Sequence, residues 1–148
     1  MGLDSLNIKI LKCLQQNARL SNAEIGRQVG VSAPAVSERI KKMEDIGIIE
    51  GYKTMVSPLD IGYQLKAIIT LRAFMGKLKA FLEKVKTYDE VINCYRITGN
   101  ENIVMEVVLK DQKHLETFID QLITYGETKT QIVLSRVVKQ KEVIPLQK

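Results

Sequence analysis

Histidine and cysteine are scarce in this sequence, which has one histidine and two cysteines among 148 residues. Cys13 and Cys94 are far apart, and each stands among apolar neighbours. A zinc centre needs several closely spaced ligands and a disulfide framework needs more cysteines, so neither is expected. We predict structural thiols buried in a reducing cytosol, with no metal and no cofactor.

Long apolar runs and enzyme motifs are also missing. No run approaches the roughly 18 residues of a membrane-spanning helix, and the N-terminus has no signal-peptide pattern. The sequence has neither a glycine-rich phosphate loop nor a Gly-x-Ser-x-Gly elbow. These absences predict a cytoplasmic protein that is not an enzyme, has no catalytic residues and has no membrane partner.

The charge balance permits an anionic partner without requiring one. The formal net charge is +5 and the pI is about 9.2, values that suit nucleic acid binding. Residues 1–58 hold only eight Lys and Arg against six Asp and Glu, so the excess is not concentrated there. The assignment of a partner therefore depends on sequence pattern.

Three short helices are predicted in the first third of the chain. Asp4 can cap a helix with an apolar face that ends near Asn17. Ser21 and Glu24 form a capping box that opens the second helix. A turn at Gly30 then leads directly into the third helix, which is the spacing of a helix-turn-helix.

The third helix opens with small residues and becomes basic further along. Ser32 can cap it, and Pro34 in the first turn costs no hydrogen bond. A recognition helix enters the major groove by its N-terminal end, where bulky side chains would hold the backbone away from the bases. The pattern favours this interpretation. The alternative is an ordinary amphipathic helix with a polar outer face.

Residues 47–56 are predicted to form a short hairpin or wing. Beyond them, alternating strands are expected at residues 65–73, 91–98, 103–110 and 128–140. Between the strands, LKAFLEKV and LETFIDQL repeat one helix pattern at an offset of 37 residues. The order is β-α-β-β-α-β, typical of a ferredoxin-like domain. We predict an α+β fold, with a winged-like helix-turn-helix domain at 1–58 and a ferredoxin-like domain at 59–148.

One face of the predicted sheet needs a cover other than the two helices. The candidates for this second face are Ile68, Ile92, Val104, Val108, Val133 and Val137. The same face of another copy would cover it in a two-fold homodimer. The two helix-turn-helix units would then contact two half-sites on double-stranded DNA.

Three stretches carry a resemblance to a known family. They are LDSLNIKILKCLQQNARLSNAEIGRQVGVSAPAVSERIKKMEDIGIIEGY, YRITGNENIVMEV and TQIVLSRVV. With these, the chain resembles the leucine-responsive regulator/AsnC family, the feast/famine transcription regulators. The resemblance implies a DNA-binding transcription regulator, nucleoid-associated when bound, whose C-terminal domain dimerises. It also implies assembly of dimers into octamers and binding of an amino acid.

The resemblance and the outer face of the third helix together suggest which residues contact DNA. The predicted DNA-binding residues are Arg19, Ser32, Pro34, Ser37, Arg39, Lys41 and Lys42. Arg19 would contact a phosphate ahead of the second helix. For Arg39 a structural ion pair with Glu38 or Glu44 is the alternative.

The effector site that the resemblance implies includes the turn Gly99-Asn100-Glu101-Asn102. Asn102 stands where the family usually has Asp, so the carboxylate for a ligand ammonium is absent or replaced by Glu101. A tight hairpin turn without a ligand is the alternative. Thr128 and Thr130 resemble further pocket positions, with core-strand packing as their alternative.

Two other functions share these motifs. Some members of the superfamily are sirohaem decarboxylases, and His114 is the only histidine for such chemistry. A capping role at the start of a helix is the alternative for this residue. A DNA-compacting protein with little sequence preference would have the same domains.

Overall fold

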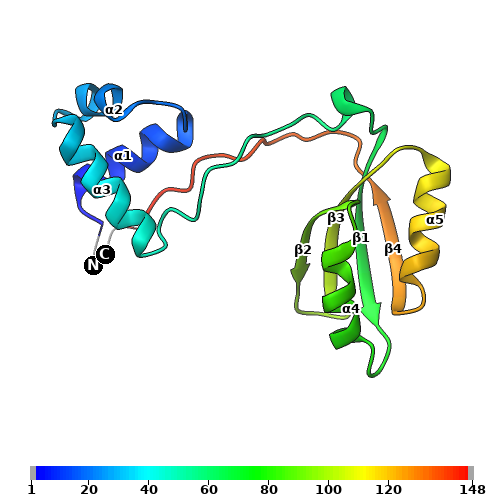
Figure 1. Ribbon diagram of the computed structural model, residues 1–148. Helices are drawn as coiled ribbons and strands as arrows, with labels where there is room; N and C mark the ends of the chain where they lie inside the picture. Colours follow the sequence, from blue (N-terminus) through cyan, green and yellow to red (C-terminus); the bar gives the residue numbers. More distant parts are fainter. Residues whose placement is uncertain (1–2, 147–148) are drawn as a thin grey trace. The chain divides into compact units, whose positions relative to one another are not determined.

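Two units make up the part of the chain that the computed structural model describes, residues 3–146 (Figure 1). The first unit contains the residues up to Met55 and also those from Val138 onward. The second unit runs from Val56 to Val137. Relative to the expected division at residue 58, the C-terminal segment belongs with the N-terminal helices. Hydrogen bonds between Gln15 and Val143 are a physical reason for this placement.

The three predicted helices form as expected, α1 at Ser5–Gln16, α2 at Asn22–Val29 and α3 at Ala33–Asp45. Asp4 caps α1, and Ser21 and Glu24 form the capping box of α2. Each cap satisfies amide groups that lack a partner within the helix. These local bonds explain why the sequence alone located the helix starts.

The first unit has its own core, in which Ile10, Ile25, Val36 and Met43 are completely buried. Gly26 lets α2 approach the start of α3, because a Cβ there would collide with the Val31 carbonyl oxygen. Val36 and Met43 therefore lie on the inner face of α3.

The hairpin predicted at residues 47–56 is wrong, since no strand forms in this part of the described chain. Gly47 adopts φ +75°, and the amides of Ile48 and Ile49 both donate to the Met43 carbonyl at the end of α3. These amides are therefore used to close α3 rather than to start a ladder. Further along, the Tyr52 hydroxyl donates to Glu44 Oε1 at 2.9 Å, which holds the segment against the same helix.

The second unit has the predicted β-α-β-β-α-β order. Its elements, with the 3₁₀ turns η1 and η2, are η1 Leu59–Ile61, β1 Leu65–Ala73, α4 Leu78–Lys84, η2 Val85–Thr87, β2 Val91–Arg96, β3 Ile103–Leu109, α5 Gln112–Leu122 and β4 Gly126–Ile132. The strands pair antiparallel in the order β2-β3-β1-β4, with β2 at one edge and β4 at the other (Figure 1). This is the ferredoxin-like topology.

Both helices of this unit cover one face of the sheet. Phe81 of α4 and Phe118 of α5 are completely buried in one cluster with Ile69 and Met105 of the central strands. Full burial of such side chains contributes about 1.5–3 kcal/mol each. The apolar residues that alternate along the central strands thus form the face of the sheet that packs against the helices.

The last strand is shorter than predicted, ending at Ile132 instead of residue 140. Ile132 pairs with Ala67, and the Val133 amide donates to the Lys66 carbonyl. Because β1 begins at Leu65, the chain beyond Val133 has at most one further β1 residue to pair with. Apolar alternation continued past the point where the neighbouring strand ends.

The opposite face of the sheet is mixed in character. Ile68, Val104 and Val108 lie on it as predicted, since the register pairs Ile68 with Glu106 and Val104 with Thr70. Ile92 falls at a bulge in β2, and Val137 lies beyond the sheet, so neither belongs to the regular face. Lys66 and Glu106 form an ion pair of 3.4 Å on the same face.

Candidate DNA-binding and effector sites

The N-terminal end of α3 is exposed and built of small residues. The Ser32 hydroxyl accepts a hydrogen bond from the Ala35 amide at 3.4 Å, and Pro34 stands in the first turn. Ser32, Pro34, Ser37 and Lys41 are all exposed. The helix can therefore bring its backbone close to a large partner, as a recognition helix requires.

Lys42 extends the basic character of this surface. Its ammonium contacts Glu38 Oε1 at 2.9 Å, one turn earlier on α3. The hydrogen bond from Lys42 holds the pKa of Glu38 below its ordinary value. Because both side chains are largely exposed, the pair contributes little to stability and Lys42 can exchange Glu38 for a phosphate.

Arg39 has partners that the sequence analysis did not predict. Its Nη1 donates to Asp4 Oδ2 at 2.6 Å and to Asn7 Oδ1 at 2.9 Å. The expected alternatives, Glu38 and Glu44, are not among these partners. Arg39 thus joins α3 to the N-terminal turn of α1.

The Arg39 contact provides a hydrogen-bond donor for Asp4 and for the buried side chain of Asn7. Asn7 is 3% exposed, and its backbone amide donates to Asp4 Oδ1 at 2.7 Å. The hydrogen bond from Arg39 is the largest cause that lowers the pKa of Asp4. A surface cavity of about 360 Å³ adjoins this network, lined by Asp4, Asn7, Ala35, Glu38, Arg39 and Lys42.

Arg19 lies in the turn between α1 and α2. Its side chain is exposed, and its backbone amide donates to Asn17 Oδ1 at 3.0 Å. This bond fixes the turn that presents the guanidinium.

The predicted effector turn is held to β1 by Asn102. The Asn102 Oδ1 atom accepts a hydrogen bond from the Ala73 amide at 2.7 Å. The backbone amide of Asn102 donates to the Leu71 carbonyl at 3.0 Å. Gly99 adopts φ +112°, a conformation that favours glycine. Asn102 therefore has a structural role that an aspartate could also fill.

Glu101 already holds an ammonium group that belongs to this chain. Its Oε1 atom contacts Lys129 Nζ at 2.6 Å, and this hydrogen bond is the largest cause that lowers the pKa of Glu101. Nearby on the sheet, Arg72 and Glu127 form a second ion pair of 2.5 Å. The positive charges of Lys129 and Arg72 are thus paired with the carboxylates of Glu101 and Glu127.

Thr128 and Thr130 lie on the other side of β4 from Lys129. They pair with Leu71 and Ile69, whose side chains face the helices, and both threonines are half-buried. Lys129 pairs with Thr70 on the opposite face. Within the described residues of one chain, the predicted effector residues do not converge on a single cavity.

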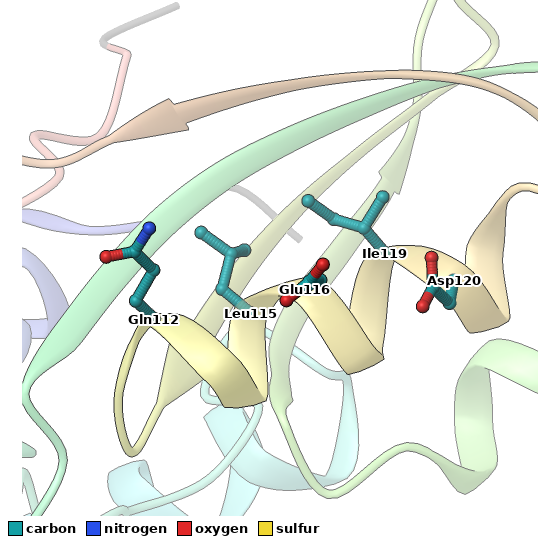
Figure 2. Close-up of a pocket in the computed structure, with 5 residues that line it drawn as sticks. All are labelled: Gln112, Leu115, Glu116, Ile119 and Asp120. Carbon is teal, nitrogen blue, oxygen red and sulfur yellow. The ribbon is translucent and has the colours of Figure 1, made fainter.

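A different cavity lies against α5, and sequence reasoning missed it. It measures about 330 Å³ and is lined by Gln112, Leu115, Glu116, Ile119 and Asp120. Figure 2 shows Leu115 and Ile119 pointing to the same side of the helix. Both side chains are half-buried, and the apolar pattern of the helix does not distinguish them from fully buried residues.

His114 uses both ring nitrogens within the protein. The Lys110 amide donates to Nδ1 at 3.1 Å, and Nε2 contacts Glu90 Oε1 at 2.9 Å. An Nδ1 that accepts a hydrogen bond assigns the proton to Nε2, which then donates to Glu90. His114 also donates its amide to the α5 cap Asp111, in agreement with the capping alternative.

The described residues show no group of three or more potential metal ligands. Cys13 and Cys94 are free thiols, and burial raises the pKa of Cys94. No helix in residues 3–146 is long and apolar enough to cross a membrane.

The helix-turn-helix and the separate αβ domain define a class, that of two-domain DNA-binding transcription regulators. Comparison of the sequence with family models supports this directly. The AsnC-type helix-turn-helix domain matches residues 3–44, and the Lrp/AsnC ligand binding domain matches residues 66–143. The chain belongs to the Lrp/AsnC family of transcription regulators.

Individual relatives agree with this assignment over most of their length. The regulator Ptr1 of Methanocaldococcus jannaschii is 34% identical over 82% of this chain and 82% of its own. LrpB of Bacillus subtilis is 31% identical over 94% of this chain and 93% of its own. Both are named as HTH-type transcriptional regulators.

Solved structures show the same architecture. AsnC of E. coli covers 98% of this chain and 100% of its own, with 30% identity and a TM-score of 0.87. A transcriptional regulator from Neisseria meningitidis, in a complex with L-Met, covers 96% of each chain with 28% identity and a TM-score of 0.90.

Proposed function

We propose that this regulator binds specific double-stranded DNA sites as a homodimer through α3 and is not an enzyme. The observation that carries the proposal is the exposed, small N-terminal end of α3, capped by Ser32. There, Ser32, Pro34 and Ser37 lie closest to the bases, while Arg19, Lys41 and Lys42 supply phosphate contacts. Base contacts provide specificity, and phosphate contacts provide most of the salt-dependent affinity.

Selection of duplexes from a random pool, followed by binding titrations, tests this function. A specific regulator binds the selected site about 10³- to 10⁷-fold more tightly than random DNA. Equal affinity for both would instead identify the low-specificity DNA-compacting protein. Ser37→Glu should abolish selective binding, because it adds bulk and negative charge at the groove. Ser57→Glu, in the exposed connector, is the matched control and should bind normally.

The ligand of the C-terminal domain is proposed to be an amino acid or a related metabolite. The L-Met complex of the Neisseria relative supports this class of ligand. The effector would act by differential affinity for two assemblies, commonly about 1–3 kcal/mol in such linkage. Gly99, Asn100, Glu101, Asn102, Thr128 and Thr130 are proposed to contribute from neighbouring subunits, since they do not converge within one chain.

A thermal-shift panel of the twenty amino acids tests the ligand. Saturation at about 100 times the dissociation constant adds about 2.7 kcal/mol, which a melting curve resolves. The panel should be repeated with Lys129→Met, which removes the ammonium that now holds Glu101. A ligand that stabilises only this variant would show that Lys129 competes for the site. If neither protein is stabilised by any amino acid, the amino-acid proposal is wrong.

The engagement of both His114 ring nitrogens supports a regulator rather than a sirohaem decarboxylase. Mixing the protein with sirohaem tests this point. We expect no change in the Soret band and no turnover, and turnover would reverse the assignment.

A further inference from the structure

A pair of hydrogen bonds joins the described part of the C-terminal segment to the end of α1. Gln15 Nε2 donates to the Val143 carbonyl oxygen at 3.1 Å, and the Val143 amide donates to Gln15 Oε1 at 2.8 Å. One side-chain amide therefore satisfies both main-chain groups of one residue. The partners are 128 residues apart in the sequence. Nothing in the DNA-binding or effector assignments requires this contact.

The contact involves the main chain of the segment rather than its side chains. Val143 is 77% exposed and Ile144 is 82% exposed, so their apolar groups do not enter the core of the unit. Pro145 is half-buried beside them. An interaction made through backbone groups tolerates changes of side chain but fails when the amide is removed.

The contact lies within the first unit and anchors the second of two chain segments that lead to the other unit. The chain leaves the DNA-binding unit after Met55 and returns to it at Val138. When Val143 is docked on Gln15, the helices of the first unit are joined to the second unit at two places. Releasing the segment leaves one connection, and a unit held by one connection loses more freedom when it binds a fixed site.

We propose that the end of α1 is a docking site for the chain's own C-terminal segment, and that docking restrains the DNA-binding unit for binding. The two bonds are solvent-exposed, so they favour the docked state by about 5- to 30-fold. The segment thus exchanges between a docked and a released state. The docked state predominates and binds DNA more tightly than the released state. The effect on DNA rests on the proposed function, whereas the docking itself does not.

Amide hydrogen exchange of the full-length protein tests docking without DNA. The Val143 amide should be protected about 5- to 30-fold in the wild type, and Gln15→Ala should abolish this protection. Gln16→Ala is the matched control, because Gln16 is the exposed neighbour on the same turn. Equal protection in Gln15→Ala and wild type would overturn the proposal.

A second pair of variants tests the same site from the segment. Val143→Pro removes the donor amide, while Val143→Ala shortens the same side chain and keeps that amide. Only Val143→Pro should raise the dissociation constant for the selected DNA, by severalfold and with an unchanged salt slope. Equal DNA affinities for these two variants would show that docking does not affect DNA binding. The amide hydrogen exchange experiment alone would then decide whether docking occurs. Absence of DNA binding by the wild type would count against the proposed function instead.

The occupant is tested by mixing isotopically labelled and unlabelled protein. We expect nuclear Overhauser contacts between Gln15 and Val143 within one labelled chain. Contacts seen only between a labelled and an unlabelled chain would mean that the segment comes from a second copy, which would overturn docking of the chain's own segment.

Discussion

Arg39, which the sequence predicted as a DNA contact, makes its bonds inside the protein. Its guanidinium is held by Asp4 and Asn7. Arg39→Ala leaves the buried Asn7 oxygen without this donor, which costs about 1–3 kcal/mol of unfolding free energy. We expect lower stability in urea denaturation and an unchanged salt slope of DNA binding.

Lys42→Ala is the comparison for that measurement. Lys42 is largely exposed and bonded only weakly to Glu38, so its loss should leave stability nearly unchanged. The salt slope should become flatter by about one unit, as expected for one lost phosphate contact. A flatter slope for Arg39→Ala as well would make Arg39 a phosphate contact.

Tyr52 gives a prediction on pH at the same scale. Burial, followed by the hydrogen bond to Glu44, raises the pKa of Tyr52 to about 12 from the ordinary 10.0. Because the folded protein favours the neutral phenol, this stabilisation is present below pH 10.0 and is lost as the pH rises through about 12. In an absorbance titration at high pH, Tyr52→Phe should remove one tyrosine from the transition near pH 12. An unchanged transition there would contradict the assignment.

At the scale of elements, the approach of α2 to α3 depends on Gly26. A Cβ at this position collides with the Val31 carbonyl oxygen, which is backbone and cannot move alone. Gly26→Ala should lower the unfolding free energy by about 1–3 kcal/mol and weaken DNA binding through the changed helix crossing. Urea denaturation and DNA titration measure the two effects.

Gly30→Ala is a control for Gly26→Ala. Gly30 has open space around it but adopts φ +82°, so alanine there causes backbone strain without a steric collision. We expect a cost of about 1–2 kcal/mol from the left-handed conformation. Retention of full stability and DNA affinity by Gly26→Ala would exclude the close approach.

At the scale of the whole molecule, the face of the sheet opposite α4 and α5 supports the proposed homodimer. Val104 lies near the centre of that face, between Thr70 of β1 and Tyr95 of β2. If a second copy covers it, Val104→Glu buries a charge without a partner and should weaken dimerisation at least tenfold. Sedimentation velocity measures this change. Lys79→Glu, an exposed change on α4, should leave the dimer intact.

The sequence by itself determined the features that depend on neighbouring residues. Capping groups stand three residues from the amides they satisfy, and buried side chains recur with the period of the helix or strand. For this reason the three helices, their caps at Ser21 and Ser32, and the order of elements in the sheet were all predicted. The exposed residues at the start of α3 followed from the same periodicity.

Only the tertiary structure decided the features that depend on which distant groups meet. Arg39 bonds to Asp4 and Asn7 rather than to Glu38 or Glu44, which are nearer in the sequence. The reason is that chain folding brings α1 against α3. The turn residue Asn102 bonds to β1, and β4 ends at Ile132, opposite Ala67 near the start of β1. These pairings are set by strand register.

Ion pairing and docking of the chain end were likewise beyond the sequence pattern. Lys129 reaches Glu101 across the sheet, and Gln15 binds the backbone of Val143 from the far end of the chain. Such contacts leave no periodic trace, since each depends on one side chain and one folded geometry. Periodicity therefore identified the domains, while long-range hydrogen bonds decided how individual residues are used.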